Sequence, residues 1–81
     1  MTILLFGITR DIVGNHSLNI PENDTKDLGS VGQLKSYIME LFPALKDLTS
    51  LAVAVNSNYA SDKTPISGTD EIALIPPVSG G

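Results

Sequence analysis

The stretch Ser30–Leu41, SVGQLKSYIMEL, decides the fold because it predicts the main helix of the chain. Ser30 and Gln33 form a capping-box signature, which is typical of the start of a helix. Pro43 ends the helix, since a proline forces the residue before it out of the helical conformation. Between these signals, apolar residues recur at helical spacing at Val31, Leu34, Ile38 and Leu41. The helix therefore has one apolar face, which must pack against another layer of the domain to be shielded from water.

Two short segments before this helix predict strands. Ile3–Phe6 is an apolar run, and His16–Ile20 alternates weakly between apolar and polar residues. Between them we expect a brief helical turn over Arg10–Val13, with Thr9 as its N-cap and Gly14 after its last residue. The two strands are compatible with an antiparallel hairpin.

Two further strands are predicted after the helix. They are Leu51–Asn56 and Glu71–Ile75, and prolines follow the second, where no backbone N–H is available for pairing. Pro21–Gly29 and Asp62–Gly68 are polar and predict loops. The order of strand, strand, helix, strand and strand indicates an α+β domain, in which one main helix covers one face of a mixed sheet. With the chain-terminal strands at its centre, such a sheet would have the β-grasp layout, but the pattern alone leaves the strand order open.

The sheet face turned away from the helix is also expected to be apolar. Residues that alternate with the core positions point to this face, and a solvated face would carry polar residues there. The face instead holds Leu4, Phe6, Ala52, Ala54, Ala73 and Ile75, and Tyr59 extends it. An exposed apolar patch indicates a partner-binding surface, for which Phe6, Tyr59 and Ile75 are candidates. The alternative is that a loop covers Phe6 and Ile75.

Residues 76–81 follow the last predicted strand and form a tail beyond the domain of residues 1–75. Two prolines stiffen the base of this tail, and its last two residues are glycines without side chains. Fully extended, the tail could reach about 20 Å, and its slim tip suits threading into a narrow pocket. The alternative is a frayed terminus without a function. The residues assigned to threading are Pro76, Pro77, Val78, Ser79 and Gly80.

Composition excludes several classes of function. The 81 residues make one small domain, and the absence of cysteine removes disulfides, thiolate metal sites and a cysteine nucleophile. Nine acidic and five basic residues give a net charge of −4, which would repel a nucleic acid and attract a basic protein partner. No apolar run reaches the ~20 residues of a membrane helix, and no targeting segment is visible, so we expect no membrane contact.

The polar residues form no recognisable catalytic constellation. His16 is the only histidine, and because no Ser or Asp arrangement supports a triad, we expect it on the surface. Asp70 and Glu71 are expected to be solvated or to meet basic groups of a partner, and no metal site is expected. Arg10 is assigned either to a surface ion pair or to a partner contact. We therefore expect no stably bound cofactor and no catalysis by this chain alone.

The end of the chain, Asp70–Gly81 with the sequence DEIALIPPVSGG, closely resembles the end of molybdopterin synthase small subunits, the MoaD family. Val55-Asn56 and Pro65-Ile66 resemble the family's third strand and the approach to its last strand. The resemblance spans nearly the whole chain, although Asn15–Ser50 matches only in pattern. The residues that match around the first strand are Leu5, Phe6, Gly7, Arg10, Asp11, Val13 and Gly14.

This resemblance implies a ubiquitin-like β-grasp fold and the function of a sulfur carrier. It implies that a ubiquitin-activating-type enzyme uses ATP to adenylate Gly81, whose carboxyl group is then converted to a thiocarboxylate. It further implies that the large subunit of molybdopterin synthase binds the carrier and uses its sulfur for the dithiolene of molybdopterin. The family assembly is a heterotetramer of two small and two large subunits, and we expect a cytosolic protein.

Two other functions are compatible with the same sequence. Sulfur carriers for thiamine synthesis or tRNA thiolation share the fold and the Gly-Gly end, although Pro76–Ser79 argues against both. A ubiquitin-like binding or conjugating module would use Gly81 for isopeptide bonds, or would use only the sheet face for binding. The partner that co-purifies would separate the sulfur carriers from one another. Deletion of Gly81 would identify a pure binding module, because such a module would keep its function.

Overall fold

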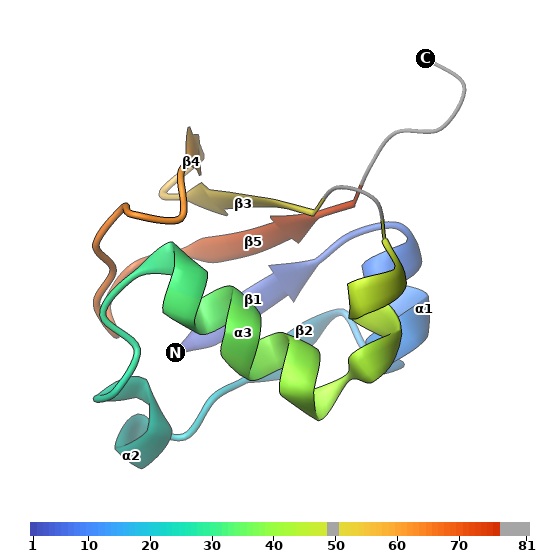
Figure 1. Cartoon of the computed structure of the whole chain (residues 1–81), viewed down its shortest axis with the longest axis horizontal. Helices are drawn as coiled ribbons and strands as arrows, with labels where there is room; N and C mark the ends of the chain where they lie inside the picture. The colour runs from blue at the N-terminus through green and yellow to red at the C-terminus, as the bar shows by residue number, and fades with distance from the viewer. Residues whose placement is uncertain (49–50, 77–81) are drawn as a thin grey trace.

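The computed structural model describes residues 1–48 and 51–76, which form a mixed sheet with one main helix across it (Figure 1). Figure 1 shows α3 in front of the sheet, with α1 and α2 toward opposite sides of the molecule. The predicted α+β class is therefore confirmed. The elements are β1 (Thr2–Leu5), α1 (Ile8–Val13), β2 (Ser17–Asn19), α2 (Glu22–Thr25), α3 (Val31–Leu41), the 3₁₀ helix η1 (Pro43–Asp47), β3 (Ala52–Val55), β4 (Asn58–Ala60) and β5 (Ile72–Ile75).

The sheet has five strands in the order β2-β1-β5-β3-β4. β1 and β5 pair in parallel, with Ile3 opposite Ile72, whereas the other pairs are antiparallel. The first and last strands of the described chain therefore lie side by side at the centre of the sheet (Figure 1). This is the β-grasp order that the sequence pattern left open, and the predicted hairpin of the first two strands is confirmed.

The apolar face of α3 packs on the sheet as its spacing predicts. Ser30 is the N-cap, and its hydroxyl accepts a hydrogen bond from the N–H of Gln33 at 3.3 Å. Leu41 is an exception to the predicted stripe, because the helix ends at this residue and leaves its side chain 50% exposed. The buried core includes Ile3, Leu5, Val31, Leu34, Ile38, Val53, Ile72 and Leu74.

The prediction of Thr9 as an N-cap is wrong. α1 begins at Ile8, so that Thr9 lies inside the helix and Gly7 takes the capping position. The Thr9 side chain is fully buried, and its hydroxyl accepts a hydrogen bond from the N–H of Phe6 at 3.0 Å. The same hydroxyl donates to the carbonyl of Phe6. Thr9 therefore fixes the turn that follows β1 instead of starting the helix.

The segment Pro21–Gly29, predicted as a loop, contains the short helix α2. The hydroxyl of Tyr37 on α3 donates a hydrogen bond to Asp24 at 2.6 Å and attaches α2 to the main helix. Since α2 has only four residues and buries none of them, it lacks the apolar periodicity that predicts a helix.

The strand β4 was not predicted either. It follows a two-residue turn at Asn56 and Ser57, which have φ values of 51° and 70°. Positive φ at both central residues is typical of the tight turn whose twist matches two paired strands. The turn pairs β4 with β3 and places Tyr59 opposite Ala54.

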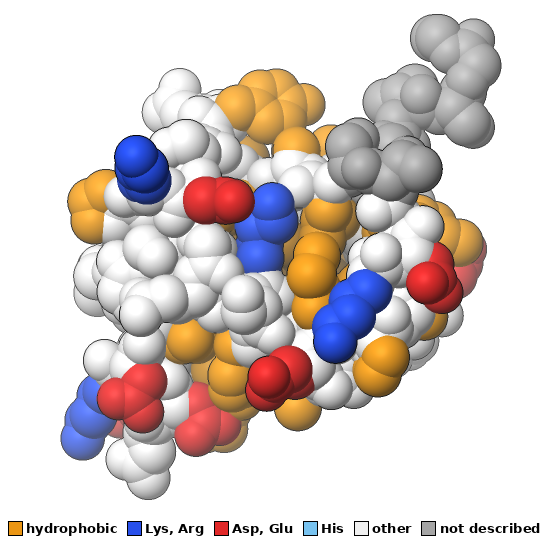
Figure 2. Space-filling model, in the orientation of Figure 1, with side chains coloured by type: hydrophobic (Ala, Val, Ile, Leu, Met, Phe, Trp, Pro, Cys, Tyr) orange, Lys and Arg blue, Asp and Glu red, His pale blue; other side chains and the backbone are white. Residues whose placement is uncertain are grey.

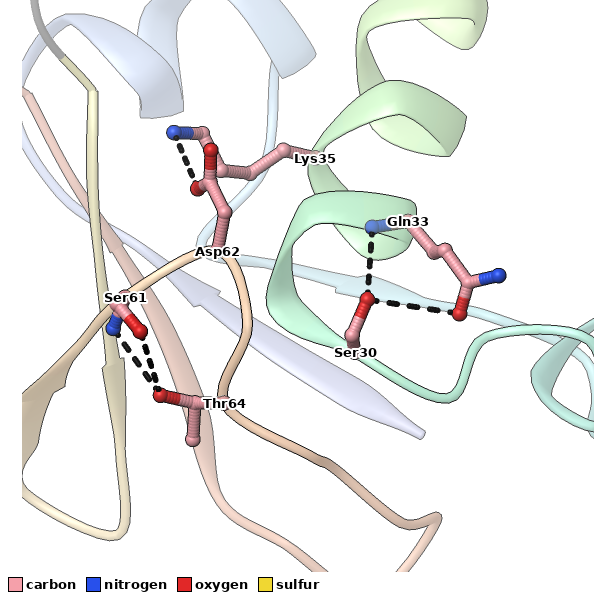
Figure 3. Close-up of polar contacts among 6 residues, drawn as sticks. All are labelled: Ser30, Gln33, Lys35, Ser61, Asp62 and Thr64. Carbon is pink, nitrogen blue, oxygen red and sulfur yellow. Dashed lines mark hydrogen bonds and ion pairs between the residues drawn. The ribbon is translucent and has the colours of Figure 1, made fainter.

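The loop after β4 rests on the first turn of α3 (Figure 3). The N–H of Gly32 donates to the carbonyl of Asp62 at 2.8 Å, and the N–H of Val31 donates to the carbonyl of Thr64 at 3.0 Å. The ammonium of Lys35 lies 3.2 Å from the carboxylate of Asp62 (Figure 3). The two backbone hydrogen bonds satisfy N–H groups that the start of a helix leaves unpaired, and the ion pair adds a side-chain contact.

Candidate docking face and tail base

The sheet face opposite α3 carries an apolar hollow of about 330 Å³. Small side chains at its centre produce the hollow, because Ala54 of β3 lies opposite Ala73 of β5. Larger side chains surround these alanines and leave space between them. The residues that line the hollow are Leu4, Phe6, Ala54, Ser57, Tyr59, Glu71, Ala73 and Ile75.

Three of the four predicted partner-binding residues line this hollow together. Phe6 is 48% exposed and Tyr59 is 75% exposed, while Ile75 is partly buried. The alternative that a loop covers Phe6 and Ile75 does not hold for Phe6, which is about half exposed in the described chain, whereas Ile75 is partly covered. Exposed aromatic side chains around an apolar depression are typical of a protein-binding surface.

Arg10, the fourth predicted partner-binding residue, lies elsewhere. It belongs to α1 and lines a separate depression of about 320 Å³ with Asp11, Gly14, Asn15 and His16. Arg10 forms no ion pair with any residue in the described ranges, where Lys35 and Asp62 form the single pair. His16 is exposed, as predicted. The structure therefore separates Arg10 from the apolar hollow.

Pro76, the first residue of the predicted tail, lies at the tail base beside the turn that follows β1. A Cβ atom built on Gly7 would lie 3.0 Å from Cγ of Pro76. The other predicted threading residues, Pro77, Val78, Ser79 and Gly80, lie outside the described residues, and so does the predicted reactive residue Gly81. The structure therefore places only the base of the tail. This base follows β5, the strand whose residues Ala73 and Ile75 line the apolar hollow.

Asn56 joins the turn after β3 to the residues just before β5. Its N–H donates to the carbonyl of Glu71 at 2.8 Å, and its side-chain oxygen accepts from the N–H of Glu71 at 2.9 Å. Its amide nitrogen also donates to the carboxylate of Asp70 at 3.0 Å. The hydrogen bond from Asn56, together with one from the N–H of Ser67 at 2.8 Å, lowers the pKa of Asp70.

Charged side chains of both signs are distributed over the rest of the described surface. Figure 2 shows acidic and basic side chains interspersed over the side that α3 covers. Within residues 1–48 and 51–76, no three His, Cys, Asp or Glu side chains are grouped so that they could hold a metal ion. Nor is any helix of these two ranges long and apolar enough to cross a membrane.

The fold defines the class of this protein. A mixed sheet with parallel chain-terminal strands at its centre, crossed by one helix, is the ubiquitin-like β-grasp architecture. Small archaeal modifier protein 1 from Methanosarcina acetivorans has the same fold, with a TM-score of 0.78 at 23% identity over 99% of this chain and 94% of that chain.

The model of the ThiS family matches residues 3–81, and the chain therefore belongs to the ThiS family. The molybdopterin synthase sulfur carrier subunit of Aedes aegypti is 38% identical over 100% of this chain and 88% of its own length. In Helicobacter pylori, a complex of subunits 1 and 2 of molybdopterin-converting factor contains a chain that is 26% identical. The match to that chain has a TM-score of 0.62 and covers 99% of this chain and 96% of that chain. The resemblance to molybdopterin synthase small subunits that the sequence predicts is confirmed.

Proposed function

We propose that this protein is the sulfur carrier subunit of molybdopterin synthase and that Gly81 carries the sulfur. The observation that supports this most directly is the course of β5. Ala73 and Ile75 of this strand line the apolar hollow, and Pro76 follows at the base of the tail. A partner that covers the hollow would therefore receive the tail at the edge of the same interface.

The proposed chemistry takes place at the terminal carboxyl group. A carboxylate oxygen of Gly81 attacks the α-phosphorus of ATP, and pyrophosphate leaves. Hydrosulfide then attacks the carbonyl carbon of the adenylate, AMP leaves with the bonding electron pair, and loss of the S–H proton yields a thiocarboxylate. A ubiquitin-activating-type enzyme would bind the ATP, as the resemblance to molybdopterin synthase small subunits implies. The sulfur atom would finally enter the dithiolene of molybdopterin.

The proposed partner at the docking face is the large subunit of molybdopterin synthase. The Helicobacter pylori complex supports this choice, because a chain of this fold is paired there with subunit 2 of molybdopterin-converting factor. Burial of Phe6 and Tyr59 would supply most of the binding free energy, as large aromatic side chains do in other interfaces. We propose a heterotetramer of two small and two large subunits in the cytosol.

Intact-protein mass spectrometry tests this function. The protein is co-expressed with its activating enzyme, and the expected result is exchange of one oxygen for sulfur at Gly81. A variant that lacks Gly81 should fold and should remain unmodified. If only the free carboxylate is found when ATP and a sulfur source are present, the proposal is wrong.

A reconstituted reaction with the large subunit distinguishes the remaining alternatives. A thiocarboxylated protein that forms no dithiolene would indicate a carrier for thiamine synthesis or tRNA thiolation. Isopeptide adducts through Gly81 would indicate a conjugating module, and activity without Gly81 would indicate a pure binding module.

A further inference from the structure

Glu71 is the only carboxylate among the side chains that line the apolar hollow. It is exposed, and it also lines the adjoining depression formed by Thr2, Leu4, Gly68, Thr69 and Asp70. A charged group at the edge of an otherwise apolar depression is costly to cover, unless the covering surface supplies an opposite charge.

The backbone of Glu71 is held firmly, whereas its carboxylate has no partner in the described chain. Asn56 bonds both the N–H and the carbonyl of Glu71, at 2.9 and 2.8 Å. No hydrogen bond or ion pair within residues 1–48 and 51–76 involves the Glu71 carboxylate. The neighbouring carboxylate of Asp70 is instead occupied by Asn56 and by the N–H of Ser67. Of the two acids, Glu71 is therefore the one available to a partner.

We propose that Glu71 forms an ion pair with a lysine or arginine of the large subunit and thereby sets the orientation of the docked carrier. This inference rests on the proposed function, because it assumes the large subunit as the protein that covers the hollow. The net charge of −4 favours a partner surface that carries positive charge.

Orientation is the specific contribution of this ion pair. Apolar contacts are non-directional, so the hollow alone would tolerate several rotations of the carrier. Glu71 precedes β5 and Pro76 follows it, and the four residues of that strand separate them by more than about 13 Å. An ion pair at one end of β5 therefore determines where the tail at the other end is directed.

The test compares three variants for binding to the isolated large subunit by calorimetry. Glu71→Gln should weaken binding about fivefold, since an ion pair at the edge of an interface contributes modestly. Glu71→Lys should weaken it more than about tenfold, because like charges then face each other. Glu40→Gln is the matched control, because it removes one negative charge from α3, which packs on the opposite face of the sheet, and it should bind like the wild type.

Salt dependence supplies a second measurement. Wild-type affinity should fall between about 50 and 500 mM salt, and it should fall less steeply for Glu71→Gln because one ion pair is missing. Equal affinities and equal salt slopes for Glu71→Gln and Glu40→Gln, with normal binding of the wild type, would overturn the inference about Glu71 alone. Failure of the wild type to bind the large subunit would instead count against the proposed function.

Discussion

The ring of Pro76 lies directly against the backbone of Gly7, where a Cβ atom would be 3.0 Å from Cγ of the proline. Gly7 has a φ of +56°, a conformation that residues with side chains rarely adopt. Both properties require glycine at this position. The turn after β1 and the base of the tail after β5 are therefore packed together only because residue 7 has no side chain.

Gly7→Val should destabilise the protein by about 2–4 kcal/mol, because backbone strain and a steric clash add together. Gly14→Val is the matched control, since Gly14 has a φ of +86° and nothing lies within 4 Å of its added Cβ. The control variant should lose only the contribution of backbone strain, which lowers the free energy of unfolding by about 1–3 kcal/mol. Urea unfolding measures both values. Adding Pro76→Ala to Gly7→Val should restore part of the stability, and no restoration would mean that the proline contact is unimportant.

Ser30→Ala should reduce the free energy of unfolding by about 1 kcal/mol, because it removes the N-cap of the main helix. Ser36→Ala on the exposed side of α3 is the control and should change stability little or raise it slightly, since alanine is a better helix former. Thermal and urea unfolding give the comparison. Equal stability of the two variants would show that the cap contributes nothing.

The protein should lose stability in acid partly through Asp70. Hydrogen bonds from Asn56 and Ser67 lower the pKa of Asp70 in the folded state, so the unfolded state takes up a proton first as the pH falls. The stabilisation is present above the unfolded value of about 4 and disappears as the pH falls through the lower folded pKa. In urea unfolding at a series of pH values, Asp70→Asn should be less stable than the wild type at neutral pH and should show a smaller acid-dependent loss. An unchanged pH profile for the variant would contradict this assignment.

Phe6→Ala and Tyr59→Ala should each weaken binding of the large subunit by about tenfold or more, as expected for aromatic residues at the centre of an interface. Leu41→Ala is a matched control, because Leu41 is 50% exposed and Phe6 is 48% exposed, but Leu41 lies at the end of α3. Its affinity should stay at the wild-type level. A larger effect at Leu41 than at Phe6 would place the interface on the α3 side of the molecule and would contradict binding at the apolar hollow.

Addition of one residue after Gly81 should abolish sulfur transfer and leave the fold unchanged. Under the proposed function, the terminal carboxyl group would then be displaced by one residue from its position in the partner's pocket. Intact mass measures thiocarboxylation, and circular dichroism checks the fold. Normal transfer by the lengthened variant would contradict a role for tail length.

The elements predicted correctly from the sequence are those with a strong periodic pattern. The apolar spacing of α3 and its cap at Ser30 suffice for the helix, and the strand alternation suffices for the exposed face with Phe6 and Ile75. The sequence does not predict β4, because this strand has only three residues and its start is defined by the positive φ values of Asn56 and Ser57. Conformations of this kind depend on pairing between strands as much as on residue type.

The division of roles between neighbouring acids could not be predicted from the sequence. Asp70 and Glu71 are adjacent and chemically alike, and the distinction arises from Asn56, which is distant in the sequence and hydrogen-bonds to both. The separation of Arg10 from Phe6 likewise depends on the packing of α1. Such assignments require the tertiary structure, because local pattern contains no information about which groups meet.

The parallel pairing of β1 with β5 makes formation of the sheet centre depend on the strand that leads into Pro76. The centre of the sheet is completed only when Ile72–Ile75 are present, so folding must await the last part of the described chain. A chain interrupted before this strand would leave both β1 and β3 with an unpaired edge. A folded copy therefore contains the strand that leads into Pro76, and the base of the tail is positioned only when the centre of the sheet is complete.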